Sequence, residues 1–174
     1  THPTAGAYFT RGTTKDQYAK YSEAGPDYVE NMQRLLRKLE TAKELVPAPV
    51  ERSGGGAQRI GVIYYGSTAP AMDEAFDLLE AAGIAVDALR IRAFPFADSV
   101  DAFISAHEQV FVVEQNRDGQ LRTLLVNECG VAPSRLVPVL HYDGTPITAR
   151  FISTEIVQSL LDGAQRVARA ANAG

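Results

Sequence analysis

Two short polar segments carry residue types suited to chemistry, and each directly follows an apolar run. The first is Gly66-Ser67-Thr68, which comes after residues 59–65. Glycine allows close backbone approach, the hydroxyls can cap a helix, and N–H groups at a helix start favour an anion. The alternative is an ordinary capped turn. We favour the turn because such caps are routine.

The second polar segment contains Glu114, Asn116, Gly119 and Gln120, and it follows the apolar run 109–113. Glu114 could act as a general base or orient a ligand, with the amides as further contacts. Alternatively, carboxylates and amides at strand ends satisfy loose backbone groups. A single carboxylate without a placed partner is weak evidence for catalysis. We therefore favour a structural or interface role and predict no catalytic residue.

A third polar and irregular segment spans residues 11–16, beginning with Arg11 and Gly12. It could contact a phosphate or a partner protein, or it could be a simple loop turn. The residues themselves leave both interpretations open.

Several kinds of site are excluded by residue type and spacing. His2, His107 and His141 have no metal-ligand spacing to one another or to Cys129. The single cysteine cannot form an internal disulfide, a zinc site or an iron–sulfur cluster. The chain also lacks the G-x-S-x-G pattern of a nucleophile elbow. Glu114, rather than an aspartate, follows the third predicted strand, which argues against a phospho-receiver domain.

Composition points to an ordinary globular domain. The 174 residues are 45% hydrophobic, enough for a sizeable core, and the net charge of −4 excludes a broadly basic nucleic-acid surface. Apolar runs stay well short of the roughly 20 residues of a membrane span. We therefore expect neither a nucleic acid nor a membrane as a partner. One cysteine favours a reducing, cytoplasmic location. The start at Thr1, without a methionine or a signal peptide, suggests a piece of a larger protein.

The elements that would position these segments alternate regularly. After an irregular stretch, helical periodicity runs from Pro26 to about Val46 and is stopped by Pro47. Strands and helices then alternate, which predicts a three-layer α/β/α domain with a mostly parallel sheet. The predicted strands are 59–65, 84–91, 109–113 and 136–140, and the predicted helices are 70–82, 98–107, 120–129 and 153–170. Pro138 places the last strand at or near a sheet edge.

A composition break lies near residue 50. Residues 1–50 carry seven basic and six acidic residues, whereas residues 51–174 carry ten and fifteen. The break coincides with two prolines and the run Ser53-Gly54-Gly55-Gly56, a linker signal. We therefore predict a connecting arm and helix in residues 1–50 and an α/β domain in residues 51–174.

These segments together resemble the alpha subunit of 2-oxoacid:ferredoxin oxidoreductases, above all the 2-oxoglutarate enzymes. Residues 9–16 and 28–38 resemble the family's TRGT-x-HD stretch and the R-x-x-RK helix that follows it, with Lys15 where histidine is common. The domain from residue 51 has the G-S-T turn at 66–68 and a V-E-x-N-x-x-G-Q-L loop at 113–121. It also has turns at 94–96 and 143–146 that are similar to the family's P-F-P and D-G-x-P turns.

The resemblance implies an enzyme that decarboxylates a 2-oxoacid to an acyl-CoA and reduces ferredoxin. It also implies that this chain is the domain shaped like the transketolase C-terminal domain. Thiamine diphosphate, magnesium, an iron–sulfur cluster and coenzyme A would belong to the whole enzyme, with no cofactor held in this chain. The implied partners are the beta subunit, the rest of the alpha subunit and ferredoxin.

Within that family the chain would organise subunits, and its strand-end loops would face neighbouring domains. The residues we expect to contact a ligand or partner are Arg11, Gly66, Ser67, Thr68, Glu114, Asn116 and Gln120. Two alternatives stay open. One is a stand-alone anion- or nucleotide-binding α/β module, and the other is the same domain of a pyruvate-type enzyme.

Overall fold

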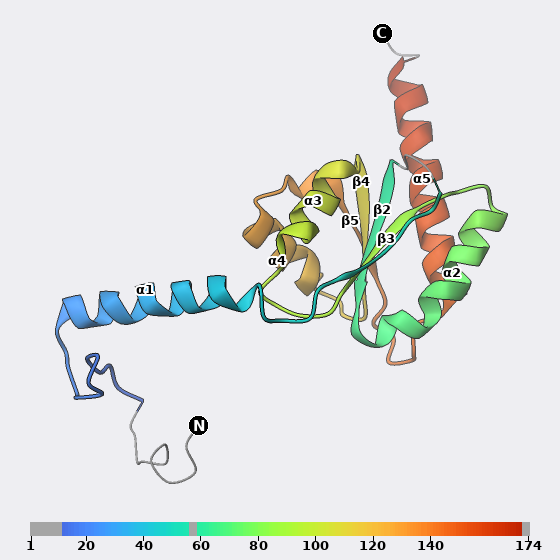
Figure 1. Cartoon of the computed structure of the whole chain (residues 1–174). Helices are drawn as coiled ribbons and strands as arrows, with labels where there is room; N and C mark the ends of the chain where they lie inside the picture. Colours follow the sequence, from blue (N-terminus) through green and yellow to red (C-terminus); the bar gives the residue numbers. More distant parts are fainter. Residues whose placement is uncertain (1–11, 56–58, 172–174) are drawn as a thin grey trace. The chain divides into compact units, whose positions relative to one another are not determined.

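The structure, a computed structural model, describes residues 12–55 and 59–171 (Figure 1). Its contacts divide the chain into two compact units, Thr1–Leu45 and Val46–Gly174, which are described separately below. Among the described residues, the larger unit contains the sheet, four α-helices and two short 3-10 helices, Gly66–Thr68 and Pro133–Arg135. The smaller unit contains a turn segment and one long helix.

The larger unit is built on a five-stranded sheet. The strand order is β1-β3-β2-β4-β5. β2 to β5 are mutually parallel, and β1 pairs antiparallel with β3 at one edge. Their bounds are β1 Val50–Arg52, β2 Ile60–Tyr65, β3 Asp87–Ile91, β4 Gln109–Glu114 and β5 Leu136–Leu140. The predicted mostly parallel sheet is confirmed, and the proline-containing β5 lies at an edge as predicted.

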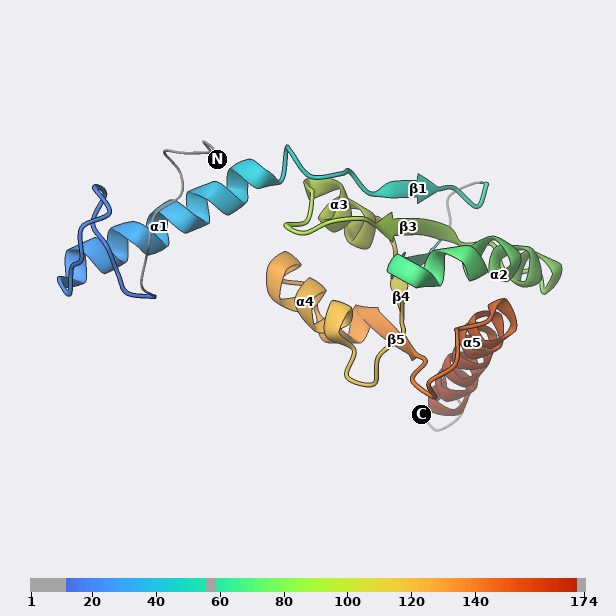
Figure 2. The ribbon, with the colours of Figure 1, turned by 90° about the horizontal axis from the view of Figure 1, so that it is seen from below.

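Helices cover both faces of this sheet (Figures 1 and 2). α2 (Ala69–Ala81) and α5 (Ala149–Ala171) pack on one face, and α3 (Asp98–Ala106) and α4 (Gln120–Cys129) pack on the other. Alternate residues of β2 and β4 contribute to the two apolar clusters, which is why both strands are apolar almost throughout. The three-layer α/β/α architecture is therefore confirmed.

The elements differ from the predictions chiefly in four places. α1 spans Gly25–Ala42, so it ends about four residues before the predicted end near Val46. β1 has no counterpart among the predicted strands, because its three residues are all exposed and carry no apolar period. β3 begins at Asp87 rather than at residue 84. α5 begins at Ala149, four residues before the predicted start, because the buried Ile152 already belongs to its apolar stripe. No helix in the described part of the chain is long and apolar enough to cross a membrane.

The smaller unit is dominated by α1 (Gly25–Ala42), which starts with a proline in its first turn. None of its residues is buried. Large apolar side chains nevertheless recur along it at helical spacing, and all are 39–59% exposed. We call this set the α1 stripe: Tyr28, Val29, Met32, Leu35, Leu36 and Leu39.

Candidate functional site

The two polar segments singled out from the sequence meet at the carboxyl ends of β2 and β4. These strands are neighbours, but the chain leaves β2 toward β3 and leaves β4 toward β5, on opposite sides. Such a change of direction opens a crevice, and open α/β sheets usually bind ligands there. The two polar segments therefore lie side by side at this edge of the sheet.

Glu114 ends β4 with its side chain completely buried. Its carboxylate accepts hydrogen bonds from the backbone N–H groups of Leu121 (2.7 Å) and Arg122 (2.9 Å), in the first turn of α4. It also accepts one from the Asn116 side-chain amide (2.8 Å). A buried carboxylate at the positive end of a helix satisfies N–H groups that the helix itself cannot. Glu114 thus joins β4 to α4.

The rest of the loop holds this arrangement in place. Asn116 Oδ1 accepts from the Gln120 backbone N–H (3.2 Å), so the same amide braces both the carboxylate and the helix start. Gly119 has a φ of 61°, a left-handed conformation that favours glycine. The glutamate, asparagine and glycine of the V-E-x-N-x-x-G-Q-L pattern therefore stabilise the N-terminus of α4.

Gln115 connects the two loops. Its Nε2 donates to Ser67 Oγ (3.0 Å) and lies 3.4 Å from Thr68 Oγ1, and its Oε1 accepts from the Ile147 backbone N–H at 3.4 Å. Thr68 is buried. The hydroxyls predicted as possible anion contacts therefore already accept hydrogen bonds from the protein.

A cavity of about 380 Å³ opens beside this braced region, on the α3–α4 face of the sheet. We call it the strand-end cavity. Gly66 and Gln120, two of the residues predicted from the sequence, line it. The full lining is Tyr65, Gly66, Ile91, Arg92, Ala93, Phe94, Phe96, Gln120, Leu121 and Leu124.

The predicted contact residues thus fall into three groups. Ser67, Thr68, Glu114 and Asn116 are engaged in hydrogen bonds within the loops, and Gly66 and Gln120 line the cavity. Arg11 lies outside the residues that the structure describes. Sequence reasoning missed Arg92 and the two phenylalanines as cavity residues. The available signal was that the 94–96 turn follows β3, next to the end of β2.

The turn after β5 lies at the same carboxyl edge. The backbone N–H and the hydroxyl of Thr145 both donate to Asp143 Oδ1, each at 2.8 Å. These two hydrogen bonds, the backbone one foremost, lower the pKa of the Asp143 carboxyl. His141 is buried, and its backbone N–H donates to the Glu114 carbonyl (2.9 Å). This edge is therefore held together by contacts within the protein.

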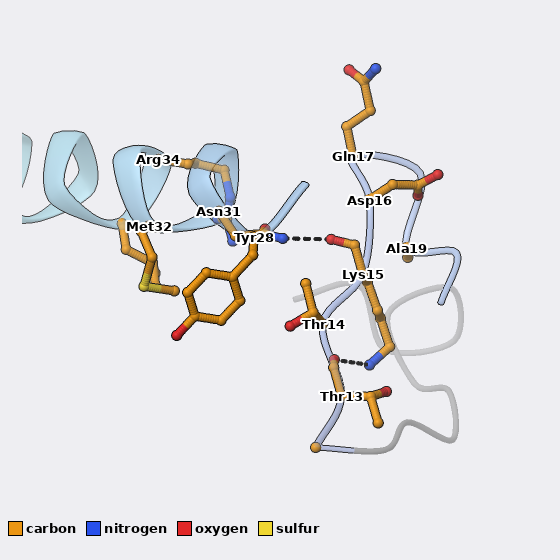
Figure 3. A pocket seen from close by; sticks show the side chains of 12 residues that line it. Thr13, Thr14, Lys15, Asp16, Gln17, Ala19, Tyr28, Asn31, Met32 and Arg34 are labelled. Atoms are coloured by element: carbon orange, nitrogen blue, oxygen red, sulfur yellow. Dashed lines mark hydrogen bonds between the residues drawn. The ribbon is translucent and has the colours of Figure 1, made fainter. Parts of the chain in front are cut away.

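The third polar segment forms a turn against α1. Asp16 Oδ1 accepts from the backbone N–H groups of Tyr18 and Lys20, both at 2.9 Å, and Asn31 of α1 donates to the Lys15 and Asp27 carbonyls. This turn and α1 line an open cavity of about 640 Å³. Figure 3 shows side chains that line it. Asp16 and Asn31 act here as anchors of the turn, which agrees with the loop-turn interpretation.

No group of three or more histidine, cysteine, aspartate or glutamate side chains within residues 12–55 and 59–171 could hold a metal ion. In the same ranges, every buried side-chain nitrogen and oxygen has a hydrogen-bond partner. The polar groups at the strand ends therefore serve cohesion, and none of those described is a metal-binding cluster.

Comparison with known proteins shows where this architecture occurs. A 2-oxoacid:ferredoxin oxidoreductase subunit alpha of Saccharolobus solfataricus is 27% identical over 168 residues, covering 94% of this chain and 26% of that protein. The subunit alpha of a second such enzyme, from Aeropyrum pernix, is 26% identical over 161 residues, covering 90% and 25%. The chain is a distant homologue of this subunit. It spans about a quarter of the length of these curated relatives.

Solved structures give the same picture of the fold. The 2-oxoglutarate:ferredoxin oxidoreductase of Magnetococcus marinus, with 2-oxoglutarate, coenzyme A and succinyl-CoA bound, superposes with a TM-score of 0.76. It is 21% identical, and the match covers 90% of this chain and 27% of that one. A split-gene transketolase matches with a TM-score of 0.50 and 20% identity, over 64% of this chain and 41% of that one. The predicted transketolase C-terminal-like fold is confirmed. No family model matches the chain.

Proposed function

We propose that this chain is the C-terminal, non-catalytic assembly part of the alpha subunit of a 2-oxoacid:ferredoxin oxidoreductase of the 2-oxoglutarate type. In this proposal residues 1–50 are the arm that joins it to the rest of the subunit. Residues 51–174 are the transketolase C-terminal-like domain. The homology to the alpha subunit supports the enzyme family. The resemblance of residues 9–16 and 113–121 to segments of the 2-oxoglutarate enzymes favours 2-oxoglutarate as the acid.

The observation that carries the assembly role is the α1 stripe. Six large apolar side chains on one 18-residue helix are at least 39% exposed, although the helix is amphipathic. An isolated helix of this length is marginal in water and normally gains stability by burying its apolar face. Contiguous exposed apolar surface of this kind marks a protein–protein contact. The stripe therefore favours a partner surface in the assembled enzyme.

The state of the strand-end residues supports a non-catalytic role. Glu114, the carboxylate that could have been a base, holds the first turn of α4 and is fully buried. Ser67 and Thr68 accept hydrogen bonds from Gln115. A general base needs a free path to the proton it removes, and a nucleophile needs an adjacent base. These contacts favour a non-catalytic role, and the α1 stripe favours assembly over a stand-alone anion-binding module.

The cofactors of the proposed enzyme would be held elsewhere. Thiamine diphosphate would supply the carbanion chemistry, and magnesium and an iron–sulfur cluster need carboxylate or thiolate ligand sets. The described residues offer no such cluster. In this proposal the beta subunit and the rest of the alpha subunit hold thiamine diphosphate, magnesium and the iron–sulfur cluster, and coenzyme A is a co-substrate of the complete enzyme. Ferredoxin would meet the complete enzyme.

The test uses a full-length alpha subunit that carries this region, expressed with its beta subunit. The double variant Leu35→Ser with Leu39→Ser removes two apolar side chains of the α1 stripe. We expect the variant to lose subunit co-elution in gel filtration by at least about tenfold, since buried leucines at interfaces each contribute on the order of 1 kcal/mol or more. 2-Oxoglutarate-dependent ferredoxin reduction should fall in parallel.

The matched control is Gln33→Ser with Arg37→Ser, on the polar side of the same helix, which has a similar cost in helix propensity. This control should assemble and turn over normally. Equal assembly of both double variants would overturn the proposal. Replacing 2-oxoglutarate by pyruvate in the assay separates the two enzyme types, because faster ferredoxin reduction with pyruvate would contradict the 2-oxoglutarate assignment.

A further inference from the structure

The strand-end cavity has features that the assembly role does not use. Its volume of about 380 Å³ falls at the lower end of the range of small-ligand sites. It lies at the carboxyl ends of β2 and β3, beside the crevice between β2 and β4 where open α/β sheets bind small molecules. Position and size together favour a small molecule over a large partner surface.

The walls of the cavity are apolar and partly aromatic. Phe94 and Phe96 meet edge to face, with their ring centroids 5.3 Å apart. Phe96 is buried, but Phe94 remains 45% exposed and Tyr65 37% exposed. Leu121 and Leu124 of α4 also line the cavity. A flat ring would bury the exposed aromatic surface and meet ring edges at the geometry that aromatic pairs prefer.

The lining has few polar side chains. Among the described lining residues, Arg92 carries the charge, and Tyr65 and Gln120 add a hydroxyl and an amide. Arg92 Nη1 lies 3.5 Å from the Ala48 carbonyl, which is a long contact. A guanidinium has five N–H donors, so further donors remain for a carboxylate.

The backbone N–H groups at the start of α4 are not available to bind an anion in the cavity, because they donate to other protein groups. The N–H groups of Leu121 and Arg122 donate to Glu114, and the N–H of Gln120 donates to Asn116. A negatively charged group in the cavity would therefore be recognised by Arg92 rather than by the end of α4.

From these contacts we propose that the strand-end cavity binds a small aromatic carboxylate. The ring lies among Phe94, Phe96 and Leu124, and the carboxylate lies at Arg92. The site is a binding site without catalysis. It belongs to this chain alone, so it stands or falls independently of the assembly role.

The test measures binding of 3-phenylpropionate to the 174-residue chain by NMR of isotope-labelled methyl groups. We expect saturable shifts at Ile91, Leu121 and Leu124, with a Kd on the order of 1 mM for a ligand of about eleven non-hydrogen atoms. Ile152 and Ile156, in the apolar cluster on the other face of the sheet, should not shift. Absence of saturable shifts at the cavity methyls would overturn the proposal.

Two pairs of variants test separately how the shape of the cavity and the charge of Arg92 contribute to binding. Leu124→Trp fills the cavity and should abolish binding, whereas Leu161→Trp, on the exposed surface of α5, should not. Arg92→Gln should weaken 3-phenylpropionate about threefold to fivefold and leave the neutral 3-phenylpropanol unchanged, as for a partly exposed ion pair. Arg117→Gln, an exposed arginine outside the cavity, should change neither. If Arg92→Gln weakened acid and alcohol equally, the carboxylate assignment would be wrong.

Discussion

The two units of the chain differ in how far they bury their large apolar side chains. In the Val46–Gly174 unit, β4 lies between β2 and β5, with Val110 to Val113 fully buried between two helix layers. In the Thr1–Leu45 unit, α1 carries large apolar side chains at helical spacing but buries none of its residues. Large apolar side chains therefore have different surroundings in the two units.

The contrast shows that an amphipathic helix needs a surface to cover its apolar face, but its sequence does not say which surface that is. α2 and α5 find their partners in the sheet and in each other. The described apolar side chains of α1 are exposed, and the proposed function gives them a partner surface in the assembled enzyme. Stability of the α/β unit and assembly of the proposed enzyme should accordingly respond to different residues.

The sharpest test of the contrast exchanges one apolar side chain in each unit for alanine. Phe111→Ala, in the centre of β4, should lower the free energy of unfolding by about 3–5 kcal/mol, because it removes a fully buried ring and leaves a cavity. Leu36→Ala, in the α1 stripe, should change it by less than about 0.5 kcal/mol. Urea unfolding followed by circular dichroism measures both.

A large loss for Leu36→Ala would break the contrast, since it would mean that the α1 stripe is buried within this chain. An exposed residue of the same unit provides the baseline: Arg37→Ala, on the polar side of α1, should behave like Leu36→Ala.

The second prediction concerns the polar part of the α/β unit. Glu114→Ala should lower the free energy of unfolding by about 3 kcal/mol, because the N–H groups of Leu121 and Arg122 and the amide of Asn116 lose their acceptor in a buried position. Glu114→Gln keeps the shape and one acceptor oxygen and should cost roughly half as much. The same urea titration measures both variants.

Glu155→Gln, an exposed glutamate of α5, is the matched control and should leave stability within about 0.5 kcal/mol of the parent. A Glu114→Gln variant as stable as the parent would show that the carboxylate is not a structural acceptor, and would reopen a chemical role for it.

Much of the fold could be predicted because its signals are local. The buried strands β2 and β4 are short apolar runs, and the helices carry a period of 3.6 with glycine or proline at their ends. β1 could not be predicted, since its three exposed residues become a strand only by pairing with β3, as Val50 does with Arg90. That pairing depends on the tertiary arrangement rather than on a pattern in residues 50–52.

The candidate site was predictable only in its location. The sequence places Ser67 and Glu114 at the ends of two apolar strands, and the strand order brings these ends together. Which side chains would bond to each other could not be predicted, because Gln115 reaches Ser67 across 48 residues of sequence. Arg92 was missed for the same reason: its role in the cavity depends on α4, which begins only at Gln120.

The smallest effects are expected at one exposed polar contact in each unit. In the α/β unit, Thr145 lowers the pKa of Asp143 through two hydrogen bonds. In the smaller unit, the hydrogen bond from the Tyr21 hydroxyl to the Glu23 carboxylate raises the pKa of the Tyr21 phenol. NMR titration of the two side chains should show these opposite shifts. Thr145→Val and Glu23→Gln should each move the pKa of the residue it contacts back toward its ordinary value.

The two contacts also predict opposite pH dependence of local order. A lowered carboxyl pKa stabilises the 143–146 turn above the unfolded pKa, and this contribution is lost as pH falls through the folded pKa. A raised phenol pKa stabilises the Tyr21 contact below the unfolded pKa, and this is lost as pH rises through the folded value, above 10. Both groups are exposed to solvent, so global unfolding should not follow either titration. If acid loss of the Asp143 contact instead unfolded the sheet, the carboxyl edge of the α/β unit would depend on that turn rather than on Glu114.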